Sequence, residues 1–128
     1  MKLDNVKGAQ IVKKLYKEND LNKNDIYYDT ARQFVIITRS GIEKLALRHN
    51  IKYKYEFIKC EKDMIVIKGD AYNTEDNTIL STTSASATKE NSNSRYLVEI
   101  AEKRFKSRAC LMALNYYSLG VFGKDELE

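Results

Sequence analysis

The sequence predicts an α+β fold in which an antiparallel β-meander of three to four strands packs against a long C-terminal helix, with a short helix at the N-terminus. Residues 51–60 alternate between apolar and charged side chains, which is the pattern of a strand with one face in water. Two further strand patterns, over 64–72 and 78–87, follow after short polar turns. Residues 96–118 carry apolar side chains at helical spacing, so a long helix is available to cover the apolar face of the sheet. We expect its buried stripe to comprise Val98, Ala101, Phe105, Ala109, Met112 and Tyr116.

The N-terminal third predicts two helices separated by a loop and a strand. Apolar residues at helical spacing predict a helix over 6–18, and the asparagine-rich segment 19–25 predicts a loop. The β-branched and aromatic run 34–38 predicts a buried strand. Ser40 is followed three residues later by Glu43, which is the pattern of a capping box, so we expect the second helix to begin at Ser40.

Length and composition predict one domain over residues 1–128, which contain 43% hydrophobic and 31% charged residues. We divide it into a helix and loop over 1–25, a sheet-and-helix core over 26–123 and an acidic tail over 124–128. No stretch approaches the roughly 20 apolar residues of a membrane span, and the N-terminus has no apolar leader segment. We therefore expect a cytoplasmic protein, in the host cytoplasm if a phage encodes it, that has no membrane partner and keeps both cysteines reduced.

The residues that carry most enzyme chemistry are sparse. One histidine, His49, and two distant cysteines fall short of the four ligands that a structural zinc site takes. Glycine-rich phosphate loops and nucleophile motifs are absent from the sequence. Glu99 and Glu102 lie one helical turn apart and suit a metal or acid–base pair, but ion pairs with Lys103 and Lys106 explain them better. We predict no enzymatic activity, no metal and no cofactor.

Two arginines of the C-terminal helix are candidates for phosphate binding. The net charge of +4 is compatible with a polyanionic partner. Arg104 and Arg108 lie four residues apart, so they project from nearly the same face, at the border of the apolar stripe. Two planar guanidinium groups held together suit phosphate oxygens. The alternative is that both arginines pair with acids elsewhere in the fold, and the spacing favours neither interpretation.

The strand over 51–60 interleaves lysines with aromatic residues. Lys52 and Lys54 lie on its predicted wet face, where they suit a phosphate track beside stacked bases. We expect Tyr53, Tyr55 and Phe57 to face the core, which leaves the lysines either to bind phosphate or only to solvate the strand.

Three segments carry a resemblance to a known family. Residues 100–109 (IAEKRFKSRA), 119–126 (LGVFGKDE) and, more weakly, 37–46 (ITRSGIEKLA) resemble phage single-strand annealing proteins of the Erf and Sak types and the Rad-group annealing superfamily. The resemblance spans residues 34–126. It implies an antiparallel sheet packed against the long helix, side-by-side assembly of subunits, and a basic groove that holds single-stranded DNA by its backbone. It also implies DNA contacts at Lys103, Arg104 and Arg108.

Our leading hypothesis is a single-stranded DNA-binding and annealing accessory protein of phage-type recombination or replication, acting as a homo-oligomer with replication or recombination proteins as further partners. The serine- and threonine-rich strand over 78–87 is expected to be a sheet edge open to pairing. The alternative is a small phage module that binds and inhibits a host protein without nucleic acid, through the acidic tail and exposed tyrosines. The predicted nucleic-acid-binding residues are Lys52, Lys54, Lys103, Arg104, Lys106 and Arg108.

Overall fold

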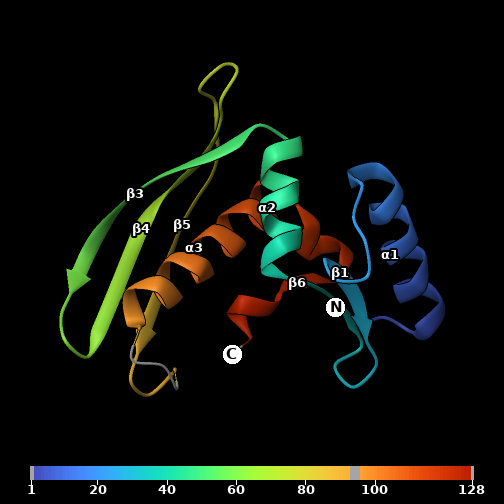
Figure 1. The fold of residues 1–128 in the computed structure, drawn as a ribbon, viewed down its shortest axis with the longest axis horizontal. Helices are drawn as coiled ribbons and strands as arrows, with labels where there is room; N and C mark the ends of the chain where they lie inside the picture. Colours follow the sequence, from blue (N-terminus) through green and yellow to red (C-terminus); the bar gives the residue numbers. More distant parts are fainter. Residues whose placement is uncertain (1, 93–95, 128) are drawn as a thin grey trace.

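The computed structural model describes residues 2–92 and 96–127 and has an α+β fold with two three-stranded sheets (Figure 1). Its elements in chain order are α1 (Asn5–Asn19), β1 (Ile26–Asp29), β2 (Phe34–Ile37), α2 (Arg39–Arg48), β3 (Ile51–Cys60), β4 (Met64–Asn73), β5 (Ile79–Thr88), α3 (Leu97–Ala113), the 3₁₀ turn η1 (Tyr116–Leu119), β6 (Val121–Gly123) and the 3₁₀ turn η2 (Lys124–Glu126). The fold class is therefore the one that the sequence predicts.

The predicted meander forms the larger sheet, in which β3, β4 and β5 pair in antiparallel order. The predicted strands match β3, β4 and β5 to within one residue at each end, because short polar turns in the sequence separate all three. Ile67 of β4 and Ala85 of β5 are buried on the face that packs against α3. Tyr53 and Tyr55 pack against Phe105 of α3 from the same face, as expected. Phe57 does not: it lies near the far end of β3 and is 44% exposed.

The C-terminal helix is shorter than predicted. α3 has 17 residues and ends at Ala113, because Asn115 adopts a left-handed backbone conformation with φ 58° and the chain then turns into η1. Ala101, Phe105 and Ala109 are fully buried, as predicted. The expected stripe is wrong at two positions. Val98 and Met112 are 36% and 41% exposed, and the interior instead takes in Arg104, Ser107, Cys110 and Leu111.

The second sheet was not predicted. β1 and β2 form an antiparallel hairpin, and β6 pairs parallel to β2, with Val35 opposite Val121. Ile26, Val35 and Val121 are fully buried. β1 and β6 have only four and three residues, too few to show a period, and the β2–β6 pairing joins distant segments. The sequence therefore predicts β2 correctly, as the buried strand over 34–38, but gives no local sign of its two partners.

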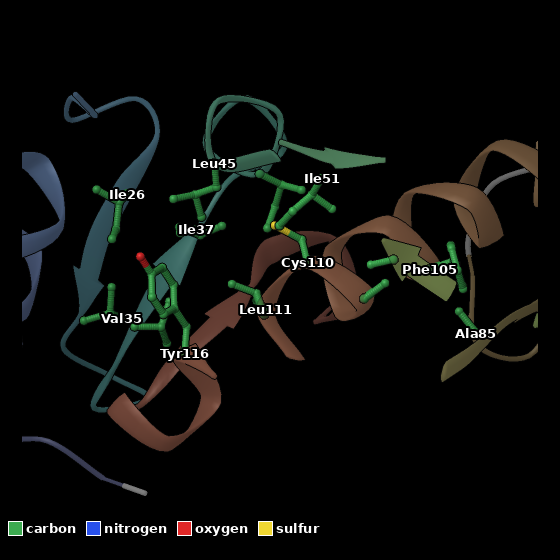
Figure 2. Packing of buried hydrophobic residues seen from close by; sticks show 14 of the residues in the cluster. Ile26, Val35, Ile37, Leu45, Ile51, Ala85, Phe105, Cys110, Leu111 and Tyr116 are labelled. Atoms are coloured by element: carbon green, nitrogen blue, oxygen red, sulfur yellow. The ribbon is translucent and has the colours of Figure 1, made fainter. Parts of the chain in front are cut away.

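One cluster of buried residues joins the two sheets. Figure 2 shows Phe105 near Ala85 of β5 at one end and Ile26 and Val35 of the small sheet at the other, with Leu111 between them. α1 has 15 residues, so it is longer than the short helix predicted, and it contributes the fully buried Leu15 to the same cluster. The segment predicted as helix and loop over 1–25 therefore packs onto the core.

The second helix begins one residue before the predicted capping box. Thr38 is the N-cap of α2, and its Oγ1 accepts a hydrogen bond from the backbone N–H of Gly41. Glu43 lies near Arg39, with an oxygen 3.3 Å from its Nε, instead of reaching back to the helix start. The capping box at Ser40 is therefore wrong, because Thr38, the residue directly after β2, already caps the helix.

Ser40 instead fixes the buried carboxylate of Asp25. Its hydroxyl donates to Asp25 Oδ1 at 2.7 Å, and Lys44 Nζ lies 2.7 Å from Oδ2. Burial opposes ionisation of Asp25, but these bonds and the backbone N–H of Asn22 outweigh it, so the pKa of the carboxyl lies below its usual value. These contacts tie the loop before β1 to the first turn of α2.

Candidate nucleic-acid interface

Arg104, the first residue of the predicted guanidinium pair, points into the protein. It is 7% exposed, and its Nη1 donates to the backbone oxygen of Ser86 and to Oδ1 of Asn91, each at 2.9 Å. Its Nη2 donates to the backbone oxygen of Asn91 at 2.7 Å, and its Nε to that of Asp125 at 3.4 Å. A phosphate would have to displace these internal acceptors, which is costly for buried groups. We therefore leave Arg104 out of the proposed interface.

Arg108 lies closer to solvent but is also engaged. Its side chain is 43% exposed, its Nε donates to Glu126 at 3.1 Å, and its Nη1 donates to the backbone oxygen of Ser84 at 2.8 Å. Glu126 in turn accepts from the hydroxyl of Tyr117 at 2.5 Å and has an exposed side-chain fraction of 11%. The acidic tail is therefore packed against α3 over residues 124–126. Arg108 follows the alternative interpretation of the sequence, in which it pairs with an acid of the fold.

Lys103 and Lys106 lie away from the two arginines. They line a groove of about 340 Å³ between α2 and α3, whose apolar side is formed by Ile42, Ala46 and Tyr53. The other charged side chains of this groove are Arg39, Glu43, Glu99, Glu102 and Asp125. Carboxylates thus outnumber the basic groups along the groove, which makes it a poor path for a phosphate backbone.

The predicted ion pairs between these glutamates and lysines are not found among the described residues. Glu102 instead accepts a hydrogen bond from the hydroxyl of Tyr55 at 2.5 Å. This bond and partial burial raise the pKa of Tyr55 to about 12. The contact joins β3 to α3, so Glu102 has a structural role in place of the surface pairing that we expected.

Lys52 and Lys54 lie on the face of the large sheet that is turned away from α3. We call this surface the open face, because α3 crosses the opposite face (Figure 1) and the odd-numbered residues of β4 and of residues 81–87 in β5 point toward that helix. Its side chains include those of Lys52, Lys54, Glu56, Lys59, Val66, Lys68, Asp70, Tyr72, Ile79, Thr82, Ser84 and Ser86.

Three lysines of the open face have no ion-pair partner in the part of the chain that the structure describes: Lys52, Lys54 and Lys68. All three are exposed. Two carboxylates lie opposite them in the strand register, Asp70 opposite Lys54 and Glu56 opposite Lys68, but neither forms an ion pair with these lysines among the described residues. The lysine ammonium groups are therefore available to an external anion.

Tyr72 brings an aromatic ring to the same face, directly opposite Lys52 in the register. Sequence reasoning missed both Tyr72 and Lys68, although the alternation in β4 carries the signal. Lys68, Asp70 and Tyr72 occupy even positions of β4, whose odd positions include the buried residues Ile67 and Ala71. Applying the alternation pattern to β4, as was done for β3, would have placed Lys68 and Tyr72 on the solvent-facing side of the sheet.

The six predicted residues therefore fall into three places. Lys52 and Lys54 lie on the open face, and Lys103 and Lys106 lie in the mixed-charge groove. Arg104 and Arg108 line a hollow of about 400 Å³ at the edge of β5, which also includes Val66, Ser84 and Ser86. Of the four predicted residues outside the open face, Arg108 lies at its border and adds an exposed cation to the open face.

No family model matches the chain, and no curated protein or solved structure matches it either. None of the helices in residues 2–92 and 96–127 is long and apolar enough to cross a membrane. Within the same residues, no group of three or more His, Cys, Asp or Glu side chains is placed to hold a metal ion.

Proposed function

We propose that the protein binds single-stranded DNA through the open face of β3, β4 and β5, and that it promotes strand annealing as an accessory protein of phage-type recombination or replication. The observation that carries the proposal is the set of three lysines beside Tyr72 that form no ion pair within residues 2–92 and 96–127. Lys52 and Lys54 are two residues apart on one strand, hence about 7 Å. Lys68 adds a third cation from the neighbouring strand.

The shape of this surface favours a single strand over a duplex. The face of a three-stranded sheet does not insert into a major groove as a helix or a two-stranded ribbon does. Unpaired bases can instead lie flat on an aromatic ring while lysines follow the backbone. The hydroxyls of Thr82, Ser84 and Ser86 add neutral hydrogen-bonding groups that do not select a sequence. Annealing then requires only that phosphate repulsion is reduced while most bases stay accessible.

Homo-oligomerisation stays a prediction, but the edge of β5 is a poor place for it. The backbone oxygens of Ser84 and Ser86 already accept hydrogen bonds from Arg108 and Arg104. A second chain pairs poorly with an edge strand whose outward backbone oxygens already accept hydrogen bonds. We therefore place the subunit contact elsewhere, and β3, the other edge of the sheet, is the available strand.

A titration of a labelled single-stranded oligonucleotide tests the proposal. The informative variant replaces all three open-face lysines: Lys52→Gln, Lys54→Gln and Lys68→Gln. The matched control makes the same charge change on α1, at Lys13, Lys14 and Lys17, which are exposed on a helix that packs against the small sheet. If only the total positive charge matters, both variants should bind the oligonucleotide equally weakly. If the binding site is on the open face, only the open-face variant should lose affinity.

The groove between α2 and α3 favours a second candidate function, a module that binds a host protein. Its apolar wall and charges of both signs suit a protein surface better than a phosphate backbone. Ala46→Glu places a charge on the apolar wall. Capture of a host protein that survives nuclease treatment and is lost in this variant, together with an absence of oligonucleotide binding, would favour the second function.

A further inference from the structure

The open face contains a hollow of about 270 Å³ at the end of the β4–β5 hairpin. It is lined by Lys54, Asp70, Tyr72, Asn77 and Ile79. The strand register is interrupted here: Ala71 is opposite Ser81, but the next residue, Tyr72, is opposite Ile79. Leu80 is therefore an extra residue in β5, and this bulge brings Ile79 beside the tyrosine ring.

Two of the lining residues offer flat or apolar contact. Tyr72 and Ile79 are cross-strand neighbours, and Ile79 is 61% exposed, which is unusual for an isoleucine in a strand. An apolar side chain beside an aromatic ring forms a surface on which a planar ring can pack. The volume is sufficient for one heterocyclic base.

Each of the other three residues offers a polar atom that has no partner among the described residues. Among the described residues, Asp70 uses Oδ1 to accept from Thr82, and its Oδ2 has no recorded bond. The side chain of Asn77 likewise has none, and Lys54 has no ion pair. A carboxylate accepts only, so the edge of a base that it recognises must carry donors.

We propose that this hollow holds one unstacked guanine of the bound strand. Guanine is the base whose Watson–Crick edge presents two adjacent donors, N1–H and the N2 amino group, to a carboxylate. Asp70 accepts from these donors, the ring packs against Tyr72 and Ile79, and Lys54 neutralises a neighbouring phosphate. This inference rests on the proposed function and specifies the base that the open face prefers.

Competition between matched oligonucleotides tests the preference. A thymine run with one central guanine is compared with the same run containing hypoxanthine, which lacks the N2 amino group, or thymine at that position. We expect the guanine oligonucleotide to bind roughly tenfold more tightly than either, the range of one bidentate base contact. Asp70→Asn should remove this difference while it retains or strengthens binding of the thymine run, because it removes a negative charge.

Glu56→Gln is the matched control, since it removes one carboxylate from the same face outside the hollow. It should keep the guanine preference. Equal binding of all three oligonucleotides by the wild type, or a preference that persists in Asp70→Asn, would overturn the inference and leave the proposed function standing. If the wild-type protein binds none of them at low salt, the proposed function itself fails.

Discussion

Nη1 of Arg104 donates a hydrogen bond to the backbone oxygen of Ser86 at 2.9 Å, and this contact ties the exposed edge of β5 to the interior face of α3. The same guanidinium holds Asn91, so one side chain fixes both the edge strand and the turn that follows it. Arg104 thus has the role of a structural clamp, although its spacing from Arg108 resembles a phosphate-binding pair.

The first prediction follows from this clamp. Arg104→Ala should lower the free energy of unfolding by on the order of 3 kcal/mol, because it leaves buried acceptors without donors. Arg108→Ala should cost about 1 kcal/mol, because its ion pair is partly exposed. Urea unfolding measures both. An Arg104→Ala protein with wild-type stability and lost DNA binding would instead identify Arg104 as a direct phosphate contact.

The second prediction concerns salt. Three lysine–phosphate contacts on a single strand give a slope of log K against log salt of about −2, since each contact contributes about −0.7. Lys54→Gln should make the slope shallower by one such contact. Titrations at several salt concentrations measure it. A slope near zero would mean that the lysines do not meet phosphates.

The third prediction uses His49, whose Nε2 lies 2.8 Å from Oδ1 of the buried Asn19. Burial and the nearby Arg48 lower the pKa of His49 in the folded protein. Well above pH 6.5, the ordinary pKa of histidine, both folded and unfolded chains keep it neutral. Below this value the unfolded chain takes up the proton first, so stability should fall as the pH drops.

His49→Gln provides the control for this titration, because it keeps a polar side chain that does not titrate. We expect its urea midpoint to change less than that of the wild type between pH 7 and pH 5.5. Identical changes in both proteins would exclude His49 as the source.

The fourth prediction opposes a rule of helix propensity. Gly41 lies in the first turn of α2, where replacing glycine by alanine is expected to stabilise a helix by up to about 1 kcal/mol. In this fold, a Cβ on Gly41 would overlap the backbone oxygen of Asp25. Gly41→Ala should therefore lower the thermal midpoint. A higher midpoint would show that the loop before β1 does not pack against α2 as described.

The sequence predicts the meander well because the evidence for it is local. Alternation over the first half of β3 is visible within a few residues, and it places Lys52, Lys54 and the half-buried Tyr53 and Tyr55 on the correct faces. The small sheet could not be predicted in this way, because the three residues of β6 form a strand only by pairing with β2, which is distant in the sequence. The same holds for Arg104, whose acceptors on Ser86 and Asn91 come from outside its helix. Helical spacing shows which residues share a face, but not what that face meets.

The most direct test of the account is the titration of a labelled single strand against the wild type, the open-face triple variant and the α1 triple variant at low salt. We predict that the open-face variant binds on the order of tenfold or more weakly, as expected for the loss of three exposed charge contacts, while the α1 variant keeps wild-type affinity. Equal weakening of both variants, or unchanged binding by the open-face variant, would contradict a DNA-binding site on this sheet.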